Sequence, residues 1–125
     1  LVSLDALKSA VNRDTALVAA MLVNNEIGVV QPVAEISAIA HEAGALMVCD
    51  AVQGFGRMTI PNGPDLIAAC AHKLHGPKMI GALWIRSGLR IEPFIHGGEQ
   101  QSGLRSGTLS PMLCAGFGAA AKIAA

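Results

Sequence analysis

Polar side chains stand at the ends of three successive apolar runs of this chain. In chain order they are Asn24, Asn25, Asp50, Gln53, His72 and Lys73. Each one alone has an ordinary explanation, because Asn and Asp favour turns and a lysine after a strand is usually solvated. Taken together, they bring amides, a carboxylate, an imidazole and an amine to consecutive strand ends. A purely structural chain has no need of this combination, so we treat the set as a candidate active site.

The elements that must position these residues alternate between helices and strands. Periodicity and capping signals predict helices over residues 3–11, 32–44 and 114–125. Apolar runs of strand length predict strands over residues 16–23, 45–50, 65–71 and 81–85, the last with Trp84 in the core. His41 and Arg86 are expected to be solvated. This order predicts an α/β fold with a mainly parallel sheet, whose ligands gather at the carboxyl ends of the strands.

Pyridoxal phosphate is a cofactor that needs such a set of groups. Its aldehyde forms a Schiff base with a lysine amine, and its pyridine nitrogen needs a carboxylate partner so that the ring can withdraw electrons. Lys73 and Asp50 have the types that these two roles require. Gln53 has the type needed for a hydrogen bond to the ring hydroxyl. The residues therefore predict an enzyme that uses this cofactor.

Composition excludes several other classes of function. The chain is 52% hydrophobic with a formal net charge of zero, which disfavours a nucleic-acid partner. No apolar run approaches the roughly 18 residues that cross a membrane. Cys49, Cys70 and Cys114 lie in apolar sequence, and we expect them to be buried, reduced thiols of a cytoplasmic protein. A zinc site from Cys70, His72 and His75 is disfavoured because His75 lies across a turn and no second ligand cluster follows.

Four segments resemble the cysteine desulfurases of the class V aminotransferase family. They are, in chain order, MLVNNEIGVVQP, VCDAVQGFG, CAHKLHGPKMIGALWIR and IHGGEQQSGLRSGTLSP, and they extend from Met21 to Pro111. The resemblance implies part of the large domain of a fold-type I transferase that depends on pyridoxal phosphate. It implies transfer of sulfur from L-cysteine to an enzyme cysteine, which becomes a persulfide while alanine is released. It also implies a homodimer that supplies iron–sulfur cluster assembly through a scaffold or acceptor protein.

The resemblance gives roles to the residues around the cofactor ring. Lys73 is the catalytic lysine that forms the Schiff base, and Asp50 is the partner of the pyridine nitrogen. Gln53 bonds the ring hydroxyl. Asn25 lies near that hydroxyl and the substrate carboxylate. All of these positions match the family's motifs in this sequence.

The residues expected around the phosphate depart partly from the family. His72 contributes to the phosphate cup, and Thr108 reaches the phosphate of the neighbouring subunit. Cys70 occupies the place of a usual serine, and a thiol is a weaker hydrogen-bond donor than a hydroxyl. The glycine-rich segment before Thr108 also differs from the family, at Glu99, Gln101 and Ser102.

The resemblance further implies that residues 1–125 are an internal piece of the large domain. The N-terminal phosphate loop and the C-terminal domain, with its sulfur-accepting cysteine and substrate-binding arginine, are expected outside it. We therefore expect the isolated piece to be inactive. Two alternatives remain open: a related class V enzyme such as a selenocysteine lyase or aminotransferase, and a catalytically inactive α/β module for dimerisation or binding.

Overall fold

The computed structural model describes residues 1–124, and its elements match the expected order. They are α1 (Leu4–Ala10), β1 (Leu17–Met21), α2 (Val33–Glu42), β2 (Leu46–Asp50), β3 (Leu66–Cys70), the short 3₁₀ helix η1 (His72–Leu74), β4 (Gly81–Ile85) and α3 (Pro111–Ala124). Ser3 caps α1 by accepting a hydrogen bond from the Ala6 N–H. Residue 125, expected in the last helix, lies outside the described part of the chain.

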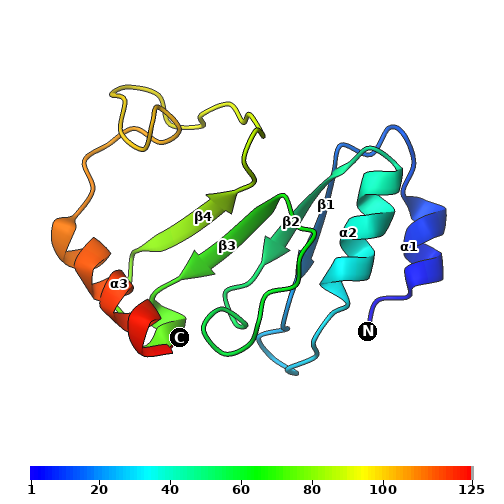
Figure 1. Ribbon diagram of the computed structural model, residues 1–125, viewed down its shortest axis with the longest axis horizontal. Coiled ribbons are helices and arrows are strands. Elements are labelled where there is room, and N and C mark those ends of the chain that lie inside the picture. Colours follow the sequence, from blue (N-terminus) through cyan, green and yellow to red (C-terminus); the bar gives the residue numbers. More distant parts are fainter. Residues whose placement is uncertain (125) are drawn as a thin grey trace.

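The strands form one sheet in the order β1-β2-β3-β4. The pairs β1–β2 and β2–β3 are parallel, whereas β4 runs antiparallel to β3. The prediction of a mainly parallel sheet with helices is therefore confirmed. Because β1, β2 and β3 run in the same direction, their carboxyl ends share one edge of the sheet, which faces downward in Figure 1. We call this the carboxyl edge.

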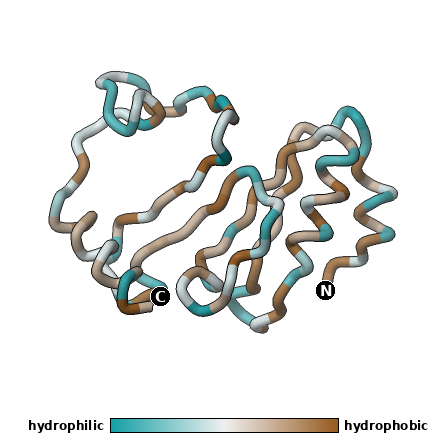
Figure 2. The backbone as a smooth tube through the Cα atoms, viewed as in Figure 1, coloured by the Kyte–Doolittle hydropathy of each residue, from teal (hydrophilic) through white to brown (hydrophobic). Residues whose placement is uncertain are grey.

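The main core lies between α2 and the first two strands. Its fully buried members come from α2, β2 and the segments beside them: Leu22, Val33, Ile36, Ala40, Ala45, Met47, Cys49 and Ala51. Figure 1 shows α1 and α2 side by side next to β1 and β2, with α3 beyond β3 and β4, and Figure 2 shows the strands as largely hydrophobic. The core prediction for Trp84 is wrong. Its strand β4 is one of the two edge strands of the sheet, the one farther from α1 and α2, and the indole remains 51% exposed.

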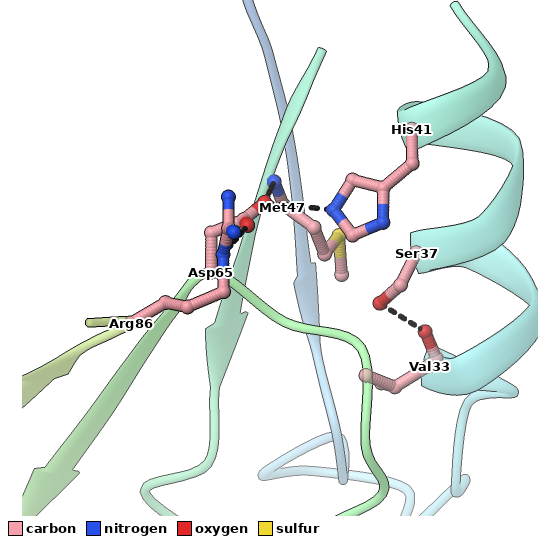
Figure 3. Close-up of polar contacts among 6 residues, drawn as sticks. All are labelled: Val33, Ser37, His41, Met47, Asp65 and Arg86. Carbon is pink, nitrogen blue, oxygen red and sulfur yellow. Dashed lines mark hydrogen bonds and ion pairs between the residues drawn. The ribbon is translucent and has the colours of Figure 1, made fainter. Parts of the chain in front are cut away.

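A buried carboxylate ties four elements together at the opposite edge of the sheet (Figure 3). Asp65 accepts hydrogen bonds from the Met47 N–H at 2.7 Å and from Arg86 Nε at 2.6 Å, and it lies 2.9 Å from His41 Nε2. His41 and Arg86 are thus partners of a carboxylate, which corrects the expectation that both are simply solvated. Burial opposes ionisation of Asp65, but these hydrogen bonds outweigh it and hold its pKa below the usual 3.8.

No helix within residues 1–124 is both long enough and apolar enough to cross a membrane.

Candidate functional site

The loop after β1 is a closed turn that presents Asn25. The bridge between Val23 and Val30 closes its base. Inside the turn, the Asn24 side-chain oxygen accepts hydrogen bonds from the backbone N–H groups of Glu26 and Ile27, at 2.9 and 3.0 Å. Asn24 is thus used as a turn former. Asn25, the next residue, is exposed.

The loop after β2 is built from two consecutive tight turns. Asp50 ends β2, and its Oδ1 accepts a hydrogen bond from the Val52 N–H at 2.9 Å, which orients the carboxylate. The carbonyl of Ala51 then closes the first turn and that of Gly54 closes the second. Gly54 is required here because a Cβ at this position would lie 2.8 Å from Leu22 Cδ2. The second loop therefore packs directly on the first.

The loop after β3 carries Lys73 in the short helix η1. The Ala71 carbonyl accepts from the N–H groups of both Leu74 (2.8 Å) and Gly76 (3.0 Å), which holds the turn closed. His75 ends η1 in the left-handed conformation, with φ 61°. Helix α3 packs against this turn: a Cβ at Gly116 would lie 3.0 Å from the Pro77 ring, and a Cβ at Gly76 would lie 3.0 Å from Ala120 Cβ.

The first two loops line a shared cavity of about 410 Å³. Its polar lining comes from Asn24, Asn25, Glu26, Gln53 and Arg57. Arg57 connects this cavity to the third loop, because its Nη2 donates a hydrogen bond to the Lys73 carbonyl at 2.8 Å. The structure therefore brings Asn25 and Gln53 together and links them to the segment that carries Lys73, with Asp50 at the end of the strand between.

The residues expected at the phosphate are divided between two places. Cys70 and His72 are neighbours on the third loop, with 3.8 Å between Sγ and Nε2. Thr108 is exposed and belongs to the irregular segment of residues 86–110. Figure 1 shows most of that segment arching to the upper left, away from the carboxyl edge. Within residues 1–124, no hydrogen bond joins Thr108 to the other site residues of the same chain.

The three thiols differ in their surroundings. All are free, with Cys49 buried, Cys70 half-buried and Cys114 exposed on α3. The expectation of a buried Cys114 is thus wrong, because α3 packs through other positions such as Ala120. Burial, together with the charge of Asp50, raises the pKa of the Cys49 thiol to about 11. Within the described residues, no three His, Cys, Asp or Glu side chains gather as a metal site would require.

Arg57 is the site residue that sequence reasoning missed. It follows the glycines of a tight turn, and nothing in the local pattern distinguishes it from a solvated surface arginine. Its partner is a backbone carbonyl sixteen positions along the chain. Such a contact depends on how the second and third loops pack together, so sequence spacing does not predict it.

The donor set of the carboxyl edge fits the ring end of pyridoxal phosphate. A primary amine, an oriented carboxylate and two amides come from Lys73, Asp50, Gln53 and Asn25 on three adjacent loops. These are the groups that the aldehyde, the pyridine nitrogen and the ring hydroxyl require. At the phosphate end, His72 supplies a donor.

Comparisons with known proteins show which family the chain resembles. The profile of the family described as Aminotransferase class-V matches residues 1–125. The chain is 48% identical to a protein of Candida maltosa named "Cysteine desulfurase, mitochondrial", over 98% of the chain and 26% of that protein. It is 47% identical to "Cysteine desulfurase IscS" of Rickettsia rickettsii (strain Iowa), over 99% of the chain and 32% of that protein.

Solved structures share the same fold. A "NifS-like protein" superposes with a TM-score of 0.92 at 41% identity, covering 98% of the chain and 35% of that structure. A structure titled "SspA in complex with cysteine" superposes with a TM-score of 0.89 at 38% identity, covering 97% of the chain and 36% of that structure. The chain thus spans between about a quarter and just over a third of the length of these relatives.

Proposed function

This chain belongs to the class V aminotransferase family, and from that premise we propose that the protein it forms part of is a pyridoxal-phosphate-dependent cysteine desulfurase. The reaction takes L-cysteine and a protein thiol to L-alanine and a protein persulfide. The bond from the cysteine sulfur to its β-carbon breaks, a sulfur–sulfur bond forms, and the proton released from the thiol balances the new hydrogen on alanine. The relative solved with cysteine supports the choice of substrate.

One observation carries this proposal: the amine, carboxylate and amides lie on three adjacent loops of a single sheet edge. Arg57 links the cavity of Asn25 and Gln53 to the turn that carries Lys73. Asp50 ends β2, the strand between those loops, and the hydrogen bond from the Val52 N–H orients its carboxylate. In parallel α/β sheets this edge is where ligands bind. An inactive dimerisation module has no need of these four side chains in this arrangement.

Each of these side chains has a task at the cofactor ring. Bound pyridoxal phosphate supplies a protonated pyridine ring that withdraws electrons from the substrate. Lys73 would provide the amine that holds the cofactor, and the same amine would move protons at the reacting carbon. Asp50, oriented by the Val52 N–H, keeps the proton on the pyridine nitrogen. Gln53 and Asn25 donate hydrogen bonds beside the ring hydroxyl.

The phosphate contacts are shared between two subunits in this proposal. His72, and Cys70 beside it, contact the phosphate bound in their own subunit. Thr108 contacts the phosphate of the neighbouring subunit, which makes the active protein a homodimer. The exposure of Thr108 supports this role, and so does the path of most of residues 86–110 away from the carboxyl edge. A mixed dimer of Lys73→Ala and Thr108→Ala subunits tests it, because one of its two sites would contain both residues.

The remaining parts of the enzyme are proposed to lie outside residues 1–125. The chain matches about a third or less of the length of relatives named as cysteine desulfurases. We assign it to the cofactor-binding large domain, with the N-terminal phosphate loop and the C-terminal domain elsewhere. The sulfur-accepting cysteine belongs to that C-terminal part, so residues 1–125 by themselves would not turn over cysteine. Persulfide sulfur would pass to an acceptor or iron–sulfur scaffold protein.

We propose the cytoplasm as the compartment, because free thiols such as those of Cys70 and Cys114 persist in a reducing environment. The names of several relatives place those proteins in mitochondria. Fractionation of cells that express the tagged intact protein decides between these two locations.

Borohydride trapping tests the function directly. The intact protein is incubated with pyridoxal phosphate, reduced and digested, and the labelled peptides are mapped. We expect the label on Lys73, its loss in Asp50→Ala, and release of alanine from L-cysteine by the unreduced enzyme. Label spread over Lys8, Lys78 and Lys122 in a folded protein would refute the cofactor site. A label on Lys73 without alanine release would refute the desulfurase reaction alone.

A further inference from the structure

Arg57 contacts the segment of Lys73 through the backbone. Its Nη2 donates to the Lys73 carbonyl at 2.8 Å, and this is a bond between two different loops of the carboxyl edge. The arginine also lines the cavity that Asn25 and Gln53 share. A positively charged donor makes a stronger hydrogen bond to a carbonyl than a neutral donor does. Arg57 is exposed, so solvent weakens this contact, but its location links the turn of Lys73 to the neighbouring loop.

The Lys73 carbonyl has few other donors within reach of its own turn. Carbonyls at the end of a short helix lack partners inside the helix. In η1 the N–H groups of Leu74 and Gly76 both donate to Ala71 instead. The following residue, Pro77, has no N–H to donate. Arg57 is the side chain that the structure places on this carbonyl, and it acts as a cap for η1.

Arg57 itself is held on a firmly packed base. Its own N–H donates to the Gly54 carbonyl at 3.0 Å, which closes the second tight turn of its loop. The preceding residue, Gly56, lies against η1: a Cβ there would lie 2.9 Å from Leu74 Cδ2. Gly56 also has a positive φ of 71°, which glycine adopts at low cost. The loop after β2 thus packs against η1, and Arg57 adds a hydrogen bond between the two.

We propose that Arg57 is a positioning residue for Lys73: it caps η1 and thereby sets where the lysine amine stands relative to the cavity. The role rests on the proposed function, since positioning matters only if Lys73 holds the cofactor. Arg57 is not a catalytic residue in this scheme, because it acts on the backbone of Lys73. Without it, the 3₁₀ turn opens more often, and the amine spends less time where the cofactor aldehyde would meet it.

Two measurements on the intact protein test this role. The variants are Arg57→Ala, Arg57→Lys, which keeps a charged donor, and Arg13→Ala, a control that removes an exposed arginine from the loop between α1 and β1. Hydrogen exchange of the Leu74 and Gly76 amides reports opening of η1 without any cofactor. Limited borohydride trapping with pyridoxal phosphate reports the rate at which Lys73 is labelled. A urea midpoint for each variant monitors global stability.

Loss of one charge-assisted hydrogen bond should speed exchange at Leu74 and Gly76 about fivefold to tenfold in Arg57→Ala. The rate of Lys73 labelling should fall by a similar factor, and the urea midpoint should fall by no more than about 0.7 M, because the same bond also stabilises the folded state against global unfolding. Arg57→Lys should recover part of both effects, and Arg13→Ala should match the wild type. Unchanged exchange in Arg57→Ala would overturn the positioning role, as would faster exchange without slower labelling. If the wild type itself fails to label Lys73, the proposed function is refuted, and the exchange result still decides whether Arg57 caps η1.

Discussion

Replacement of the buried carboxylate Asp65 by the isosteric amide, Asp65→Asn, should destabilise the protein by about 2–4 kcal/mol. The carboxylate accepts from Met47 and Arg86 on different oxygens, with His41 sharing the oxygen that faces Met47. An amide keeps only one of the two acceptors, so its NH₂ group must face a donor. The side chain of Asp65 is fully buried, and water does not relieve that conflict.

The magnitude follows from what each partner can do afterwards. Met47 is fully buried, so an unpaired N–H there costs about 1–3 kcal/mol. The side chains of His41 and Arg86 are 43% and 54% exposed and can turn toward water, so losing their contacts with Asp65 adds less to the destabilisation. Asp14→Asn, in an exposed loop, is the matched control and should change stability by less than about 0.5 kcal/mol.

Urea denaturation measures the effect. With a slope of about 2 kcal/mol per molar, a loss of 3 kcal/mol lowers the midpoint by about 1.5 M. A midpoint for Asp65→Asn equal to that of Asp14→Asn would refute the reasoning. It would mean that the two oxygens of Asp65 are not both needed as acceptors in the folded protein.

The same variant has a defined dependence on pH. The pKa of Asp65 is lower in the folded protein than the ordinary 3.8, so the folded state favours the ionised form. Its contribution is complete above that ordinary value and disappears as the pH falls from there through the lower pKa of the folded state. The difference between wild type and Asp65→Asn should therefore be constant from neutral pH to about pH 5 and shrink below pH 3.8. A difference that grows on acidification would contradict the assignment of Asp65 as the ionised partner of His41 and Arg86.

Three further predictions concern the turns and the thiols. Gly56→Ala should lower the free energy of unfolding, measured by urea denaturation, by about 2–3 kcal/mol. The new Cβ would lie 2.9 Å from the Leu74 side chain of η1, and the positive φ of this position is unfavourable for alanine. Gly88→Ala, with a positive φ but open space around it, should cost only about 1 kcal/mol; equal costs would refute the packing argument. An aromatic disulfide reagent at pH 8 should modify Cys114 rapidly and leave Cys49 unmodified in the folded protein, because Cys49 is buried with a pKa of about 11; fast labelling of both would contradict that burial. Cys70→Ser should tighten binding of pyridoxal phosphate roughly fivefold in a spectroscopic titration, since a hydroxyl is the better donor; no change would show that this side chain does not reach the phosphate.

The identity and order of the elements were predictable from local patterns. Short continuous apolar runs such as residues 45–50 favoured strands, and the Ser3 cap marks where α1 begins. In a parallel sheet, strand direction alone puts the following loops on one edge. For that reason Asn25, Gln53 and Lys73 could be assigned to a common site before any contact was known.

The contacts between those loops depended on tertiary packing. Arg57 meets the Lys73 carbonyl only because Gly54 and Gly56 let its loop fit between Leu22 and Leu74, and no local pattern records such a fit.

The chemical groups of the site, and the edge of the sheet at which they meet, follow from the sequence alone, because residue type and the alternation of helices and strands are local properties. The partners that hold each group follow from the packing of distant segments. Asp65, at the start of an apolar run, became the buried acceptor that His41 and Arg86 share, while Trp84, within an apolar run, stayed exposed on an edge strand. Burial depends on what the rest of the chain places over a residue, and hydropathy along the sequence does not contain that information.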